Sequence, residues 1–341
     1  MSFSCRQWQT GPVAAAGALV AALTVGPAQA QDKTFTMKIT TPTLNAALDI
    51  YAKAYGAAVE KDSGGRIKVE VYPASQLGAI PRQIEGTQFG AIQCAVIPPE
   101  FFVGVDERFE VLAAPGLVTS AAQGHRVAAD PAVQKFYLAL GAEKGLHGVA
   151  VAYAEPSEVV AKNAIRHLVD FKGKKIRIFA SEFQSASFKR LGTTPVAMSP
   201  GDVVAALQQG SLDASVAGVE LLSGLHFYDA AKYITMTNHA AIFYLVELSK
   251  KWFDALPPNL QQIVEKDAAS TVTSFQSRAN DIDSAAAKVW TDAGGELISL
   301  PADEQAELLK TLSSVGADIS KEKPALAEAY KIVSDAAQRS Q

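Results

Sequence analysis

Residues 173–213 constrain the fold of this chain more than any other segment, because strand and helix signals alternate along them. A short strand, KIRIFA, follows a turn at Gly173, and an amphipathic segment and a Thr-Thr-Pro turn come next. A helix then opens at Ser199-Pro200 and ends at Gly210. Strand, helix, strand and helix in this order predict an α/β unit, and small ligands bind beyond the carboxyl ends of strands in open α/β sheets.

Arg177 lies within this otherwise apolar strand, and both Arg177 and Phe179 emerge near the predicted ligand site. A guanidinium donates two parallel hydrogen bonds and stays protonated, so it suits a carboxylate ligand. The residues alone leave a second interpretation open, in which Arg177 sits at a strand edge and pairs with a local acid.

The first thirty residues have the pattern of an export signal. Arg6 supplies a positive charge, residues 12–25 are apolar and rich in alanine, and Ala28-Gln29-Ala30 fits a cleavage site between small residues. A membrane anchor is the less favoured interpretation, since this apolar stretch is short for a bilayer. We therefore expect cleavage after Ala30 and a periplasmic product that is not itself embedded in the membrane.

Composition excludes several function classes. The chain of 341 residues has a formal net charge of −4 without basic clusters, which argues against nucleic acid as a partner. Its five histidines are scattered, and Cys94 is the only cysteine after the export signal, so neither a metal site nor a disulfide is expected. Phosphate-loop, dinucleotide and hydrolase-elbow motifs are absent, and no cofactor or enzyme activity is predicted.

Two sets of strands indicate two domains. Residues 91–97 are predicted to form a strand that is apolar apart from Gln93 and ends at Pro98-Pro99, so Glu100 and Phe101 follow at a strand end. A second set of strands begins near Gly148. The chain is expected to leave the first domain near Tyr153 and to return near His239, and two such crossings make a natural hinge.

A long helix is predicted over residues 259–293, which contain neither glycine nor proline and repeat apolar residues at helical intervals. A helix of that length extends on the order of 50 Å, so it should lie across both domains.

Three phrases in this order resemble a known family: SGGRIKVEVYPASQLG at residues 63–78, FKGKKIRI at 171–178 and VVAALQQGSLDA at 203–214. The chain resembles the C4-dicarboxylate-binding-like solute-binding proteins of tripartite ATP-independent periplasmic (TRAP) transporters. The resemblance implies an α/β periplasmic binding protein fold with two lobes, mixed sheets, a ligand cleft between the lobes and a long helix that spans both.

The resemblance also implies an order of domains. A signal peptide (1–30) is followed by the first part of lobe I (31–153) and the first part of lobe II (154–239). The chain then returns to lobe I and begins the spanning helix (240–280), and the end of that helix and the C-terminal helices lie on lobe II (281–341).

The implied function is a receptor that captures a small organic acid and delivers it to the membrane permease subunits of a TRAP transporter. Arg177 is then the residue that clamps the ligand carboxylate. Many relatives have a second polar or basic residue in the strand before KIR, where this chain has residues 154–158. After the Leu-Asp-Ala turn many relatives have Glu-Asn, whereas this chain has Val216-Ala217-Gly218. These departures favour a monocarboxylate with an apolar or aromatic body.

The predicted ligand-binding set includes neighbours of Arg177 and residues at other strand ends. It comprises Arg177, Phe179, Glu158, Ser157, Pro98, Glu100, Phe101, Thr41, Ala217, Gly218, His239 and Phe243. Two other functions remain open from the sequence: an exported enzyme acting on a carboxylic acid, and a sensory ligand-binding subunit.

Overall fold

Two β-sheets organise the part of the chain that the computed structural model describes, namely residue 1 and residues 33–276 and 278–341. Residues 34–341 form one unit, and each sheet with its helices is called a lobe below. The predicted export signal falls within residues 2–32 apart from Met1, so its cleavage site lies outside the described residues.

Lobe I contains a five-stranded sheet in which parallel and antiparallel pairs are mixed. The strands β1, β2 and β3 are parallel, whereas β10 runs antiparallel to both of its neighbours, β3 and β4. The order is β2 (Ile67–Tyr72), β1 (Phe35–Thr40), β3 (Cys94–Ile97), β10 (Ala241–Ser249) and β4 (Leu146–Pro156). All four residues of β3 are buried, as expected for a central strand that is covered on both faces.

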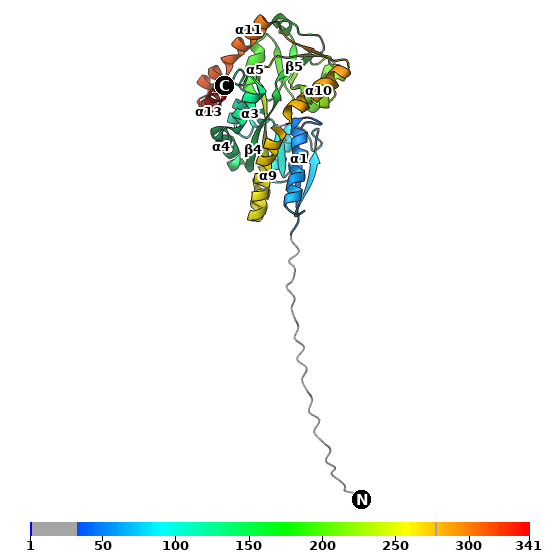
Figure 1. Ribbon diagram of the computed structural model, residues 1–341, viewed down its shortest axis with the longest axis vertical. Helices are drawn as coiled ribbons and strands as arrows, with labels where there is room; N and C mark the ends of the chain where they lie inside the picture. Colours follow the sequence, from blue (N-terminus) through cyan, green and yellow to red (C-terminus); the bar gives the residue numbers. More distant parts are fainter. Residues whose placement is uncertain (2–32, 277) are drawn as a thin grey trace. The chain divides into compact units, whose positions relative to one another are not determined.

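Helices cover both faces of this sheet (Figure 1). The elements of lobe I are α1 (Ala47–Asp62), α2 (Ile80–Phe89), the 3₁₀ helices η1 (Pro99–Phe102), η2 (Glu107–Ala113) and η3 (Ala142–Lys144), and the α-helices α3 (Ala121–Ala129), α4 (Pro131–Ala139) and α8 (Lys250–Asp254).

Lobe II contains a six-stranded sheet, which carries the predicted arginine strand near one edge. The order is β11 (Glu296–Ile298), β9 (Tyr233–Thr235), β5 (Glu158–Ala161), β8 (Ala214–Ala217), β6 (Lys175–Ile178) and β7 (Thr194–Ala197). Its helices are η4 (Leu168–Phe171), α5 (Glu182–Arg190), η5 (Pro200–Asp202), α6 (Val203–Gln208), α7 (Val219–Gly224) and η6 (Phe227–Asp229). The predicted order of strand, helix, strand and helix is confirmed.

Two of the places where the chain passes between the sheets, from β4 to β5 and from β9 to β10, are joined by hydrogen bonds. Ser157 donates its backbone N–H to the carbonyl of Ala240 (2.9 Å), and the Thr237 hydroxyl donates to the carbonyl of Ser157 (3.1 Å). The β4–β10 ladder continues to the pair Pro156 and Ala241. The first sheet thus extends beyond the predicted boundary at residue 153.

The predicted single helix over residues 259–293 is wrong, because the structure has two helices, α9 (Pro258–Gln276) and α10 (Ala279–Asp292). α9 packs on α1 and β4 of lobe I, whereas α10 packs on α7 and β11 of lobe II (Figure 1). Arg278, with φ −113° and ψ −2°, lies between them and belongs to neither helix. The division lets each helix turn its own apolar stripe toward its own lobe.

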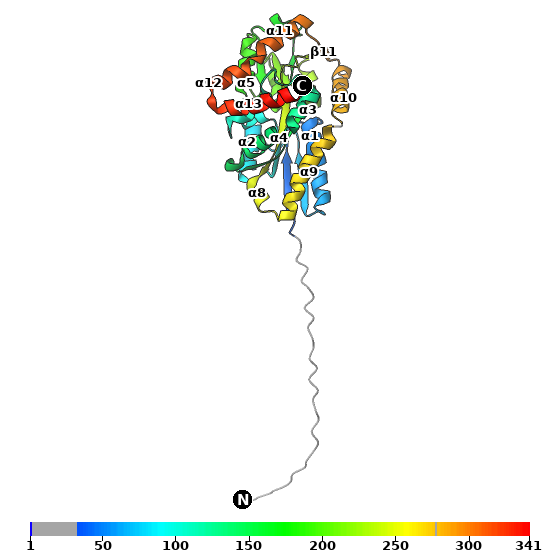
Figure 2. The ribbon, with the colours of Figure 1, turned by 60° about the vertical axis from the view of Figure 1, so that its left-hand side comes forward.

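The C-terminal helices, predicted on lobe II, divide between the lobes. α11 (Ala302–Ser313) buries Leu308 and Leu312 beside Leu168 and Leu191 of lobe II. After α12 (Val315–Glu322), α13 (Pro324–Arg339) returns to lobe I and packs on α3, α4 and η2 (Figure 2). The buried residues of α13 repeat at helical spacing and join the core of lobe I, namely Leu326, Ala329, Val333 and Ala336.

Candidate functional site

Arg177 is fully buried within lobe II and only partly paired. The neighbouring residues Ile176 and Ile178 face a hydrophobic cluster, and strand alternation puts Arg177 on the opposite face of the sheet. Its Nε donates to the carbonyl of Met198 (2.7 Å) and its Nη1 to that of Val216 (2.9 Å), whereas Nη2 has no hydrogen-bond partner among the described residues. The side chain is held in place by backbone and keeps a donor to spare.

Two phenylalanine rings connect Arg177 to lobe I. The Arg177 Cζ lies 4.7 Å from the centroid of the Phe179 ring, which is within the range of a cation–π contact. Phe179 stacks on Phe101 of η1, with ring centroids 5.4 Å apart and an interplanar angle of 25°. This aromatic stack therefore crosses from the arginine strand to the segment that follows β3.

Gln184 makes a second connection between the lobes. Its Oε1 accepts the backbone N–H of Phe179 (2.9 Å), and its Nε2 makes a long hydrogen bond of 3.5 Å to Oε1 of Glu100. Oε2 of Glu100 has no partner among the described residues. Glu100, Phe101, Arg177, Phe179 and Gln184 are together called the interlobe cluster.

Burial and mutual attraction set the charges of this cluster. Burial raises the pKa of Glu100 to about 8, with Glu110 raising it further, while the backbone N–H of Glu100 and the charge of Arg177 act in the opposite direction. Burial lowers the pKa of Arg177 to about 9, and Glu100 again opposes the shift. The carboxyl and the guanidinium therefore influence each other across the lobe interface.

The segment after β8 is shaped by Glu155. The two carboxylate oxygens of Glu155 accept the backbone N–H groups of Glu220 (2.8 Å) and Leu221 (3.4 Å), at the start of α7. A Cβ added to Gly218 would lie 1.8 Å from the carboxyl carbon of Glu155. A side chain at residue 218 would therefore have to displace this carboxylate.

Glu220 connects three elements. It accepts the backbone N–H of Ala47, at the start of α1, through Oε2, and it shares a hydrogen bond with Asp283 of α10. Burial, Glu155 and Asp283 all raise the pKa of Glu220, so its carboxyl is the protonated member of the pair. A carboxyl of lobe II thus holds the first turn of α1 in lobe I.

Glu158 and Ser157 belong to the crossing segment. Oε2 of Glu158 accepts the backbone N–H of Asn238 (3.1 Å) and the hydroxyl of Thr237 (3.3 Å), while its Oε1 is unpartnered among the described residues. The hydroxyl of Ser157 also lacks a described partner. Glu158 lines a pocket of about 260 Å³ beside this crossing, with Glu155 and Asp283.

His239 does not join the interlobe cluster. It packs edge-on to Phe188, with ring centroids 5.2 Å apart, and Phe188 belongs to the hydrophobic cluster on the face of the sheet opposite Arg177. Its Nδ1 is 2.8 Å from the Thr237 hydroxyl, and burial lowers the pKa of the ring to about 4. His239 is accordingly a neutral, buried residue in the structure.

The other predicted site residues support neighbouring loops or the core. Thr41 lies in the loop after β1, where its hydroxyl is 3.3 Å from that of Thr43. Pro98 ends β3 and opens η1, so it positions Glu100 and Phe101. Phe243 packs in the core of lobe I, edge-on to Tyr153, and Ala217 is paired with Glu158 at the end of β8.

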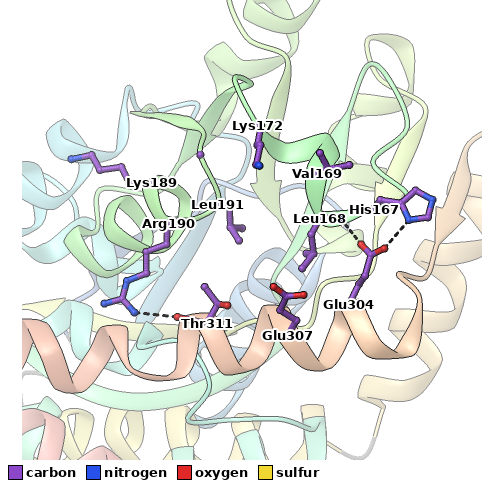
Figure 3. A pocket seen from close by; sticks show the side chains of 11 residues that line it. His167, Leu168, Val169, Lys172, Lys189, Arg190, Leu191, Glu304, Glu307 and Thr311 are labelled. Carbon is purple, nitrogen blue, oxygen red and sulfur yellow. Dashed lines mark hydrogen bonds and ion pairs between the residues drawn. The ribbon is translucent and has the colours of Figure 1, made fainter.

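A separate pocket of about 820 Å³ lies between η4, the end of α5 and α11 (Figure 3). Glu304 accepts from the backbone of Leu168 and is 2.8 Å from Nδ1 of His167 at its rim. None of the predicted ligand-binding residues lines it. Within residues 33–276 and 278–341, no group of side chains has the arrangement of a metal site, and no helix is long and apolar enough to cross a membrane.

Comparison with known proteins identifies the family. The family model described as bacterial extracellular solute-binding protein, family 7, matches residues 41–323. The chain belongs to this family. A C4-dicarboxylate-binding periplasmic protein of Rhodobacter capsulatus is 30% identical over 271 residues, which cover 77% of this chain and 81% of that protein.

Solved structures of periplasmic solute-binding proteins share the fold at low sequence identity. A TRAP periplasmic solute-binding protein from Desulfovibrio salexigens, with bound orotic acid, has a TM-score of 0.83 at 20% identity and covers 90% of this chain and 100% of its own. The sugar acid binding protein of Advenella mimigardefordensis, in complex with galactonate, has a TM-score of 0.84 at 20% identity and covers 91% of this chain and 99% of its own. The predicted TRAP resemblance and two-lobe α/β fold are confirmed.

Family membership also decides the class of function. Proteins of family 7 are solute-binding receptors, so the chain is a TRAP-type periplasmic solute receptor and the alternative of an exported enzyme is excluded.

The sequence interpretation missed two residues at the lobe interface, Gln184 and Glu110. Glu110 accepts the backbone N–H of Glu182 (2.6 Å) through Oε2, so it joins η2 of lobe I to the start of α5. The hydroxyl of Ser181 caps α5 by accepting the backbone N–H of Gln184. A serine at this position is the one sequence feature that marks the start of this helix. Nothing in the sequence indicates that Glu110, 72 positions earlier, reaches it.

Proposed function

We propose that this receptor binds a small organic monocarboxylate with an apolar or aromatic body, and that Arg177 holds the ligand carboxylate. The closed receptor then presents the ligand to the membrane permease of a TRAP transporter. The observation that carries the proposal is the unpartnered Nη2 of Arg177, on a side chain that two backbone carbonyls hold in place. A preorganised donor of this kind gains affinity because little of it must be ordered on binding.

The names of the relatives support an acidic ligand. The Rhodobacter capsulatus protein is named for C4-dicarboxylates, and the two solved structures contain orotic acid and galactonate. All of these compounds carry a carboxylate, although their bodies differ. A carboxylate on Arg177 is the feature that this receptor is proposed to share with them.

The remaining contacts favour a body without a second carboxylate. Glu155 and Gly218 occupy the positions at which many relatives place groups that hold a ligand, and the Glu155 carboxylate is already bonded to α7. Phe101 and Phe179 add an aromatic surface next to Arg177. An apolar or aromatic body packs on such a surface.

The proposed closing motion uses the two crossings at Ser157 and residues 236–240 as the hinge. A ligand favours the closed form only as far as it contacts that form better than the open one.

Export with cleavage after Ala30 is part of the same proposal. The N-terminal sequence of the exported protein should therefore begin at Gln31.

The test is binding by variants of Arg177. Thermal-shift screening of organic acids with ligand-free protein first selects a ligand, because a molecule that prefers the folded state raises the melting temperature. Calorimetry should then show that Arg177→Ala weakens binding by about 2–5 kcal/mol, roughly thirtyfold to several-thousandfold. Arg177→Lys should also bind weakly, since an ammonium lacks the planar fork.

Arg166→Ala is the matched control, because Arg166 pairs with Glu296 at the surface of lobe II. It should bind like the wild type. An unchanged dissociation constant in a folded Arg177→Ala protein would show that the carboxylate is held elsewhere.

A further inference from the structure

The buried charges of the protein are unequal in sign. Arg177 is the only lysine or arginine that is buried among residues 33–276 and 278–341. Eight carboxyl side chains are buried in the same part of the chain, namely Asp49, Glu100, Glu110, Glu155, Glu158, Glu220, Glu247 and Asp267. Since a buried charge requires a partner, the buried acids outnumber the single buried cation that could neutralise them.

Most of the acids near the lobe interface are engaged with the backbone. Glu155 accepts two N–H groups of α7, Glu110 accepts that of Glu182, and Glu220 accepts that of Ala47. Glu100 differs from these three. Its carboxyl interacts with its own backbone N–H and, at 3.5 Å, with Gln184, while Oε2 has no hydrogen-bond partner among the described residues.

The free atoms of Glu100 and Arg177 belong to one cluster and to opposite lobes. Phe101, next to Glu100 in the chain, stacks on Phe179, and Phe179 lies under the Arg177 guanidinium. Gln184 bridges the backbone of Phe179 and the carboxyl of Glu100. The lobe interface thus has a spare donor on lobe II and a spare acceptor on lobe I.

We propose that the ligand is a zwitterion, a small carboxylate that also carries an ammonium group, with its carboxylate on Arg177 and its ammonium on Glu100. This inference rests on the proposed function, because it takes the Arg177–carboxylate contact as given and adds the partner of the second group.

Charge balance distinguishes a zwitterion from a plain acid. A plain carboxylate neutralises Arg177 but leaves Glu100 buried, either ionised without a partner or protonated. A zwitterion gives each buried group an opposite charge and adds no net charge to the interface. Hydrogen bonds between charged groups are also shorter and stronger than those between neutral groups.

The test compares acids that share a carbon skeleton. Each skeleton, such as propanoate, 4-methylpentanoate and 3-phenylpropanoate, is supplied as the plain acid, the 2-hydroxy acid, the 2-amino acid and the 3-amino acid. Ligand-free wild-type protein is screened by thermal shift, and the best set of four is measured by calorimetry. We expect an amino acid to bind at least about tenfold more tightly than the plain acid and the hydroxy acid of the same skeleton.

Glu100→Gln tests the residue assignment, because the amide keeps the shape and an acceptor for Gln184 but removes the charge. This variant should lose the preference for the amino acid and bind the plain acid as the wild type does. Glu247→Gln is the matched control, since Glu247 is also a buried carboxyl without a described partner but lies on β10, between β3 and β4. It should keep the preference.

The possible failures are distinguishable. The zwitterion inference is overturned if no amino acid in the panel binds, if a plain or hydroxy acid binds as well as its amino counterpart, or if Glu100→Gln keeps the wild-type preference. In each of these cases Arg177→Ala still reports separately on the carboxylate clamp. If Arg177→Ala binds the selected ligand like the wild type, the proposed function itself fails.

Discussion

Glu155 and Gly218 form one structural feature, although they lie on different segments of the chain. The carboxylate of Glu155 reaches the start of α7 and lies in the space that a side chain at residue 218 would need. A change at either residue therefore alters the constraint on the other.

Gly218→Ala should destabilise the protein by about 1–3 kcal/mol, the usual cost of overfilling a packed site. The backbone there has φ −86°, which alanine adopts freely, so the cost is steric. Urea unfolding measures the change. Glu155→Ala removes the clash but also two hydrogen bonds, so the double variant should be more stable than the sum of the single changes predicts.

Gly201→Ala is the glycine control, because a Cβ at that position would meet nothing within 4 Å. Its free energy of unfolding should stay within about 0.5 kcal/mol of the wild type. Strict additivity of Gly218→Ala and Glu155→Ala would contradict the steric coupling.

At the scale of elements, the helices α9 and α10 show where sequence patterns stop being informative. The repeat of apolar residues over 259–293 predicts helix correctly along most of its length, and no glycine or proline marks an interruption. The division depends on the two lobes, which offer separate apolar surfaces to α9 and α10. Periodicity detects the helices but contains no information on the relative position of those surfaces.

The helix α13 illustrates the same limit. Its apolar stripe of Leu326, Ala329 and Val333 predicts an amphipathic helix that packs on something. Only the folded chain shows that the surface belongs to α3, α4 and η2 of lobe I. The arginine strand was easier to predict, since the turn at Gly173 precedes the apolar run that forms β6.

Trp290 fixes α10 to lobe II, and its replacement tests the separate packing of this helix. The ring is fully buried with Val160, Leu222 and Phe227, and it lies edge-on to Tyr228 at 5.9 Å. Trp290→Ala should lower the free energy of unfolding by about 3–5 kcal/mol, because it leaves a cavity in a packed core. Denaturant unfolding followed by circular dichroism measures the loss.

The neighbouring Val289, which is 47% exposed on the same helix, supplies the control. Val289→Ala should cost less than about 1 kcal/mol, as is usual for exposed positions. Equal losses in the two variants would mean that α10 does not pack through the stripe that contains Trp290.

At the scale of the molecule, the candidate site is an interface that neither lobe contains alone. The lone arginine in an apolar strand predicts that Arg177 and Phe179 lie at the ligand site. The proline break after β3 predicts the same for Glu100 and Phe101. Four members of the interlobe cluster could therefore be predicted from the sequence. Gln184 was not, because its role comes from a contact with a residue 84 positions away. His239 and Phe243 were predicted from their position in the chain, and the structure packs His239 against Phe188 and Phe243 against Tyr153.

Several direct contacts already hold the lobes together in this structure. Phe101 stacks on Phe179, Glu110 accepts from the start of α5, and Glu220 accepts from the start of α1. These contacts favour the approach of the lobes before any ligand contributes. The ligand-free protein should therefore be a mixture of open and closed forms, in which each contact shifts the populations.

Phe101→Ala should shift that mixture toward the open form. An aromatic pair contributes about 0.5–1.5 kcal/mol beyond its burial, so its loss should change the ratio of open to closed forms by roughly twofold to twelvefold. Small-angle X-ray scattering of ligand-free protein should then give a larger radius of gyration than the wild type, and ligand affinity should fall because closing has become less favourable. Phe89→Ala, at the exposed end of α2, should leave both quantities unchanged. An unchanged radius in Phe101→Ala would mean that the aromatic stack does not contribute to closing, and that the approach of the lobes depends on the polar contacts of Glu110 and Glu220.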